Sequence, residues 1–102
     1  MSLIESIKSC YPSPIAMSRI KHDTVGYCVG GAICLYNAEH LPPARFPCAP
    51  RLAKRLVELN PSLPAALADQ YARMIIHNND LEAFNQAWQI AASALEYQPQ
   101  EG

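Results

Sequence analysis

Residues 24–37 carry no charge and mix small and large apolar residues without a polar face. A segment that is apolar on every side is expected to be buried by the rest of the chain. Asp23 is a good helix N-cap and Asn37 suits the end of a helix. We therefore predict a buried central helix over residues 24–37.

A β-hairpin is the alternative structure for this stretch. Gly30-Gly31 is a known two-residue hairpin turn, and the flanking Val, Tyr, Ile and Thr residues favour strands. Each glycine also weakens a helix by roughly 1 kcal/mol relative to alanine. An isolated hairpin is marginal in water, however, and the sequence contains no clear third strand. The helix also places Gly26, Gly30 and Cys34 on one face, where a neighbouring helix could approach closely.

Apolar residues recur at three- and four-residue steps along most of the remaining chain. Together with the positions of proline, this spacing predicts further helices over residues 3–10, 14–20, 50–59, 64–77 and 81–96. The predicted fold is all-α: one domain over residues 1–102, a compact bundle of four or five short helices around the central helix. An α+β fold with a hairpin at 24–37 is the alternative.

The same spacing predicts which faces of the last three helices are buried. In the first of them the stripe is Leu52, Leu56 and Leu59, with Val57 beside it. In the second it is Leu67, Tyr71, Met74 and Ile75. In the last it is Leu81, Phe84, Trp88, Ala91 and Leu95, and the small Ala91 indicates close contact with a neighbour.

Composition indicates a surface that is partly covered. Only 17% of the residues are charged, against about 25% in an average domain. We therefore expect a homo-oligomer, most simply a dimer, or another protein partner. The formal net charge of −1 argues against general binding to nucleic acid or to anionic membranes.

The sequence predicts a cytoplasmic protein. No apolar run reaches the roughly 18 to 20 residues that span a bilayer. The start of the chain lacks the basic region, apolar run and cleavage site of a secretory signal. Residues 1–3 and 101–102 resemble ends added for expression, so we expect them to have no functional role.

The four cysteines show no Cys-x-x-Cys spacing; they are Cys10, Cys28, Cys34 and Cys48. We expect all of them to be reduced, and the two in the central stretch to pack as small apolar residues. A zinc site could combine His40 and Cys48 with Cys34, or His77 with Asp80, but these spacings match no known zinc motif. We predict no metal and no cofactor.

Half of the chain's eight Lys and Arg residues lie close together: Arg45, Arg51, Lys54 and Arg55. This cluster is a candidate patch for an anion or an acidic partner, although a solvated helix face is the simpler interpretation. The helices predicted at 50–59 and 64–77 could also form a DNA-binding helix–turn–helix. The start of the second helix, Pro64-Ala65-Ala66, offers no base-reading side chain, so binding to nucleic acid is not expected.

The segment His77-Asn78-Asn79-Asp80 is polar in an otherwise apolar region. Its simplest role is local: Asn78 or Asn79 adopts a left-handed turn and Asp80 caps the last helix. A second hypothesis is a His/Asp pair poised for acid–base or nucleophilic chemistry beside a buried thiol. The candidate ligand or interaction site on this hypothesis consists of Tyr27, Cys28, His77, Asn79 and Asp80.

These segments also carry a resemblance. Residues 27–33 (YCVGGAI), followed by 76–80 (IHNND), resemble a family of small uncharacterised bacterial and phage proteins. In that family an aromatic-Cys-x-x-Gly-Ala-Leu helix precedes an aromatic-Asn-Asp loop and a last helix. The resemblance covers roughly residues 20–96 and departs at Asn78, where the family usually has Trp. It implies a helical fold and no particular activity.

These observations favour a non-enzymatic protein-interaction module. One alternative is a small enzyme or ligand-binding domain, with its site between the Cys28 helix and the His77–Asp80 segment. The other is a helix–turn–helix that binds nucleic acid.

Overall fold

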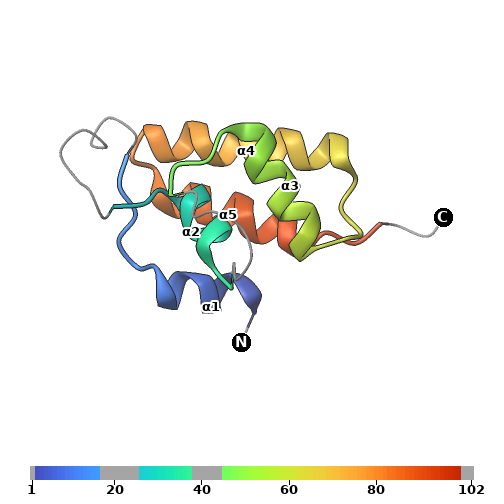
Figure 1. The fold of residues 1–102 in the computed structure, drawn as a ribbon, viewed down its shortest axis with the longest axis horizontal. Coiled ribbons are helices and arrows are strands. Elements are labelled where there is room, and N and C mark those ends of the chain that lie inside the picture. The colour runs from blue at the N-terminus through green and yellow to red at the C-terminus, as the bar shows by residue number, and fades with distance from the viewer. Residues whose placement is uncertain (1, 17–25, 38–44, 100–102) are drawn as a thin grey trace.

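The computed structural model describes residues 2–16, 26–37 and 45–99, and these form five α-helices and no strand (Figure 1). The helices are α1 (Leu3–Cys10), α2 (Val29–Leu35), α3 (Ala49–Leu59), α4 (Ala65–Asp80) and α5 (Phe84–Leu95). The predicted all-α fold is therefore confirmed. The described part of residues 24–37 contains a helix, so the alternative hairpin is wrong.

Helix α2 is the centre of the fold. It contacts each of the other four helices, while α4 packs most extensively against α3 and α5 (Figure 1). Helix α1 lies against α5 and α2, at the bottom of this view. Six of the seven residues of α2 are buried, as expected for a segment that is apolar all round.

The start of the central helix differs from the prediction. Helix α2 begins after Cys28, and Gly26 and Tyr27 precede it as non-helical backbone, whereas Asp23 lies outside the described residues. The backbone here is held by other segments, because Tyr27 O accepts a hydrogen bond from Ile15 N and Cys28 N donates to Arg45 O. At the other end Asn37 has a positive φ of 52°, as suits a residue that ends a helix.

The two glycines of α2 allow close approach by neighbouring segments. A Cβ at Gly30 would lie 2.9 Å from Leu52 Cδ2 of α3, so the expected close helix contact is found at this position. A Cβ at Gly31 would overlap the backbone carbonyl of Arg45. Gly26 precedes the helix, so the three-residue row predicted from Gly26 to Cys34 is wrong.

Near the N-terminus one feature, the helix predicted after α1, differs from the prediction. Ser2 Oγ accepts a hydrogen bond from Glu5 N at 3.3 Å, so Ser2 caps α1. The helix predicted over residues 14–20 is not formed by residues 14–16, and residues 17–20 lie outside the described part. Instead of helical bonds, Ile15 makes hydrogen bonds to Tyr27 and to the side chain of Asn79.

Helix α4 continues three residues beyond the predicted end. His77, Asn78, Asn79 and Asp80 form its last turn, so the predicted left-handed turn at Asn78 or Asn79 is wrong. The left-handed residue is Glu82, with a φ of 60°.

The chain leaves α4 in a Schellman motif, in which Glu82 N donates to Asn79 O and Ala83 N to Asn78 O. Helix α5 begins at Phe84 without a side-chain cap, so the predicted cap by Asp80 is also wrong.

The buried face of α3 agrees with the prediction, because Leu52 and Leu56 are fully buried. In α4 Ile75 is buried as predicted, but the other buried residues are Ala68, Ala72 and Asn79. In α5 Trp88 and Ala91 are buried as predicted, together with Ala87 and Ala94. Alanine lets helices pack closely, and the larger residues of α4 consequently lie beside the contact rather than within it. Leu81 is not part of the predicted seam, since its exposed fraction is 64%.

The search for membrane spans gives a negative result. Within the ranges described above, no helix combines the length and the apolar content that crossing a membrane requires.

Candidate functional site

Asn79 joins the end of α4 to the start of α2. It is the buried polar residue of the described core, with an exposed fraction of 1%. Its Oδ1 accepts a hydrogen bond from Val29 N at 2.9 Å, and its Nδ2 donates to Ile15 O at 3.0 Å. The side-chain amide of Asn79 therefore satisfies a free N–H of the first turn of α2, and it also holds the segment around Ile15 against the end of α4.

Cys28 lies beside this joint as the N-cap of α2. Its Sγ accepts a hydrogen bond from Gly31 N at 3.2 Å, and the residue is 2% exposed. Burial raises the pKa of the Cys28 thiol, against an opposing effect of the backbone N–H groups of Gly31 and Gly30. A neutral, covered thiol is a poor nucleophile, so the arrangement serves packing and capping better than catalysis.

Tyr27 is half-buried on the outer side of the joint. Its hydroxyl accepts a hydrogen bond from Ser13 N at 2.9 Å. Its ring packs edge-on against Tyr11, with the ring centroids 5.2 Å apart. These contacts attach the segment after α1 to the start of α2.

The five residues of the predicted site thus divide into two groups. Cys28 and Asn79 meet at the N-terminus of α2, with Tyr27 directly before it, whereas His77 and Asp80 are exposed on the last turn of α4. The charge of Asp80 makes a small contribution to the raised pKa of Cys28. The geometry is that of a structural joint between α2 and α4.

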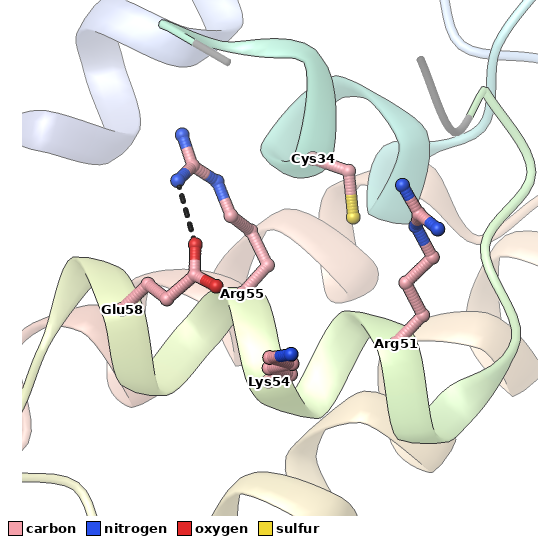
Figure 2. A pocket seen from close by; sticks show the side chains of 5 residues that line it. All are labelled: Cys34, Arg51, Lys54, Arg55 and Glu58. Carbon is pink, nitrogen blue, oxygen red and sulfur yellow. Dashed lines mark hydrogen bonds and ion pairs between the residues drawn. The ribbon is translucent and has the colours of Figure 1, made fainter. Parts of the chain in front are cut away.

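Three of the four predicted basic residues line one pocket (Figure 2). Arg51, Lys54 and Arg55 lie on the face of α3 that is turned toward the C-terminal end of α2. Cys34 and Glu58 complete a lining that encloses about 90 Å³. Arg45 is exposed and is not part of this lining.

Arg55 caps the C-terminus of α2. Its Nε donates to Ile33 O at 3.3 Å, its Nη2 donates to Tyr36 O, and its Nη1 pairs with Glu58 at 3.1 Å. A cation at a helix C-terminus compensates the partial negative charge of the carbonyl groups there. The sequence did not predict this role, because it depends on how α2 lies against α3.

Cys34 lies between Arg51 and Arg55, and its sulfur is directed toward α3 (Figure 2). Burial raises the pKa of this thiol to about 11, although the positive charges of Arg51 and Arg55 partly oppose the shift. At neutral pH the pocket therefore contains a neutral thiol among charged side chains.

A second, apolar groove of about 550 Å³ lies between α3 and α4. Pro50, Ala53 and Val57 of α3 face Ala65 and Ala68 of α4 across it. Sequence analysis missed this groove, although the three- and four-residue spacing of its α3 residues indicated a second apolar face. Ala65 is also at the start of α4, where a helix–turn–helix would require residues that read bases.

One side of α4, with the residue that follows the helix, carries a stripe of uncharged residues at steps of four, three, four and three, of which Leu67 and Tyr71 are partly buried against the core. The outer stripe consists of Leu67, Tyr71, Met74, Asn78 and Leu81. Met74 is 48% exposed and Leu81 64%, and these are the large hydrophobic residues that the described surface exposes. Most of this stripe was predicted to be buried within the chain.

The described ranges contain no group of three His, Cys, Asp or Glu residues that could hold a metal ion. All four cysteines are free, Cys10 and Cys48 being exposed, and His40 lies outside the described residues.

Comparison with protein-family models, curated proteins and solved structures gives no match to this chain.

Proposed function

We propose that this chain is a protein-interaction module that forms a homodimer through the outer stripe of α4. The observation that carries the proposal is the exposure of Met74 on α4 and of Leu81 directly after the end of this helix. Exposed large apolar residues that gather on one surface are typical of sites where another protein binds.

The stripe suits a second copy of the same chain. Leu67 and Leu81 are equally distant from Met74 along the sequence. When two copies of α4 pair in antiparallel orientation about a twofold axis, Met74 meets Met74 of the second copy and Leu67 meets Leu81. The same pairing brings the hydroxyl of Tyr71 near the amide of Asn78, two groups that can form a hydrogen bond.

The charge distribution also supports self-association. No residue of the outer stripe is charged, and helix α5, which packs against α4, contains no Asp, Glu, Lys or Arg. The core of a protein interface is depleted of charged residues and enriched in Met and aromatic residues. Two identical surfaces of this kind can meet without repulsion between like charges.

Sedimentation velocity over a range of protein concentrations tests this proposal. We expect the wild-type protein to form a dimer and Met74→Glu to be a monomer, because the substitution places two carboxylates together at the twofold axis. Ala66→Glu is the matched control: it adds the same charge at an exposed position of α4 outside the stripe and should leave the dimer intact.

Two results would contradict the proposal. One is a wild-type protein that stays monomeric up to about 1 mM, a concentration at which even about −4 kcal/mol of association would be detected. The other is a Met74→Glu variant that is folded by circular dichroism and still dimerises like the wild-type protein.

A further inference from the structure

We propose that the pocket between α3 and the C-terminal end of α2 is a binding site for a phosphate group. This inference does not rest on the proposed dimer, since the pocket is lined by α2 and α3 and the outer stripe belongs to α4. It is drawn from the charge, the size and the fixed geometry of the pocket.

The lining carries an excess of positive charge. Among the described residues of the lining, Arg51, Lys54 and Arg55 contribute three cationic groups, and Glu58, which is paired with Arg55, contributes one carboxylate. The side chains of Arg51 and Arg55 rise from α3 on either side of Cys34 (Figure 2). Because the Cys34 thiol is neutral and can act as a weak donor, it adds no repulsion toward an anion.

Arg55 is already held in position for such a ligand. Its side chain is 13% exposed and is fixed by Ile33 O, Tyr36 O and Glu58. A guanidinium group has five N–H donors, and within the described part of the chain three of them are used by these contacts. An anion would meet a group that has already lost its conformational freedom, which favours binding.

The size of the pocket matches one phosphate group. A water molecule needs roughly 15 Å³ of such volume, so about 90 Å³ holds on the order of six water-sized centres. A phosphate group has five heavy atoms and carries about two negative charges near neutral pH, which complement the excess of positive charge. Larger substituents on the phosphate would extend into solvent.

Lys54 is the residue best suited to a test. It lines the pocket, is exposed, and takes no part in the contacts described above that hold α2, so its substitution should not disturb the fold. Lys8 on α1 is an exposed lysine that does not line this pocket and supplies a matched control. Each substitution by glutamine removes one positive charge from the molecule.

The experiment is a titration with inorganic phosphate at constant ionic strength, with chloride as the replaced ion, followed by two-dimensional ¹H–¹⁵N NMR. We expect saturable shifts confined to residues 33–36 and 51–58. Lys54→Gln should weaken the affinity about tenfold, as removal of a charge-assisted hydrogen bond does, and Lys8→Gln should leave it unchanged.

Three outcomes would overturn the proposal. The shifts could fail to saturate, they could arise in other parts of the molecule, or Lys54→Gln and Lys8→Gln could weaken binding equally through net charge alone. The Met74→Glu variant separates this inference from the proposed dimer, since we expect it to bind phosphate as the wild-type protein does.

A second experiment distinguishes the sources of the phosphate group. Vesicles of phosphatidylcholine with phosphatidic acid present a phosphate monoester at a lipid surface. Co-sedimentation that Lys54→Gln abolishes would identify a lipid headgroup as the ligand. Saturable binding of inorganic phosphate without co-sedimentation would identify a free phosphate compound, and either result supports the site.

Discussion

At Gly31 the backbone of α2 lies directly against the backbone of Arg45. A Cβ at Gly31 would overlap the carbonyl of Arg45, and backbone atoms cannot give way as the end of a side chain can. We expect Gly31→Ala to lower the free energy of unfolding by about 3 kcal/mol or more, the upper range for overpacking. Urea denaturation monitored by circular dichroism measures this change.

Gly30→Ala is the control for that substitution. Its Cβ would lie 2.9 Å from the flexible end of Leu52 and at ordinary contact distance, 3.4 Å, from Pro47 Cγ, and alanine regains about 1 kcal/mol of helix propensity. The net change should therefore stay within about 1 kcal/mol. Equal losses in the two variants would contradict the close contact between Gly31 and Arg45.

The raised pKa of the Cys34 thiol predicts that the free energy of unfolding falls at high pH. Its pKa is raised by burial from 9.0 to about 11, so between these values the unfolded chain releases a proton that the folded chain retains. The contribution of the neutral Cys34 thiol to the free energy of unfolding is therefore fully present below pH 9 and is lost as the pH rises toward 11. The loss is on the order of 2 kcal/mol.

Because other groups also ionise between pH 9 and pH 11, the free energy of unfolding is compared between the wild-type protein and cysteine variants. The free energy of unfolding should fall less steeply between pH 9 and pH 11 for Cys34→Ser than for the wild-type protein. Cys10→Ser, which removes an exposed thiol, should follow the wild-type curve. A Cys34→Ser curve parallel to that of the wild-type protein would disagree with the raised pKa.

At the level of the helices, Asn79 holds α4 to α2 and to the segment around Ile15. In Asn79→Ala the buried N–H of Val29 and the partly buried carbonyl of Ile15 both lose their hydrogen bond to the Asn79 side chain. We expect a loss of about 2 to 4 kcal/mol, because each unsatisfied buried group costs about 1 to 3 kcal/mol. Thermal and urea unfolding would measure it.

Asn85→Ala provides the comparison for Asn79→Ala, since Asn85 is exposed on α5. Its change in stability should stay within about 0.5 kcal/mol, as for most surface substitutions. If Asn79→Ala were equally mild, the hydrogen bonds to Val29 and Ile15 would contribute nothing to stability.

The end of α4 offers a stabilising substitution. Glu82 has the left-handed backbone that a Schellman motif requires, with a φ of 60°, and this conformation costs a non-glycine residue roughly 1 kcal/mol. Glu82→Gly should therefore raise the free energy of unfolding by about 0.5 to 1 kcal/mol, after the greater flexibility of glycine in the unfolded chain is included.

Glu82→Ala tests the reason for that gain. It removes the same carboxylate but keeps a Cβ, so it should change stability by less than about 0.5 kcal/mol. An equal gain from alanine and glycine would attribute the effect to charge rather than to backbone conformation.

The helices themselves were largely predictable, but two of their ends were not. Helix α3 follows from its apolar period and from Pro50 at its start. The start of α2 is held by bonds to distant residues, from Cys28 N to Arg45 O and from Val29 N to Asn79, and the last turn of α4 carries the Asn79 side chain that makes the second bond. Such long-range contacts override the local signals for caps and turns.

The buried face of α4 illustrates a second limit of sequence reasoning. A rule that places the largest apolar residues inside selects Met74, whereas Ala68 and Ala72 occupy the contact because they let the helices approach. The candidate site shows the same limit. Three of the four basic residues grouped from the sequence line one pocket, but that pocket also needs the end of α2, whose position the apolar period does not specify.

For the whole molecule, the low charge content has a definite location. Helix α5 and the outer stripe of α4 contain no Asp, Glu, Lys or Arg, whereas three of the eight Lys and Arg residues lie on α3, which also packs against α4. The proposed dimer would cover part of this uncharged surface, and the Met74→Glu experiment tests that proposal.

The central position of α2 has a consequence for the order of folding. A helix of seven residues does not persist alone in water, and α2 depends on Asn79, fifty positions further along the chain. Helices α3, α4 and α5 are consecutive and meet through short connections, so they can associate first.

On this route α2 docks after the rate-limiting step. Stopped-flow kinetics should then show that Gly31→Ala and Asn79→Ala accelerate unfolding and barely slow folding. Helix α2, at the centre of the native fold, would then be the last of helices α2 to α5 to form and pack.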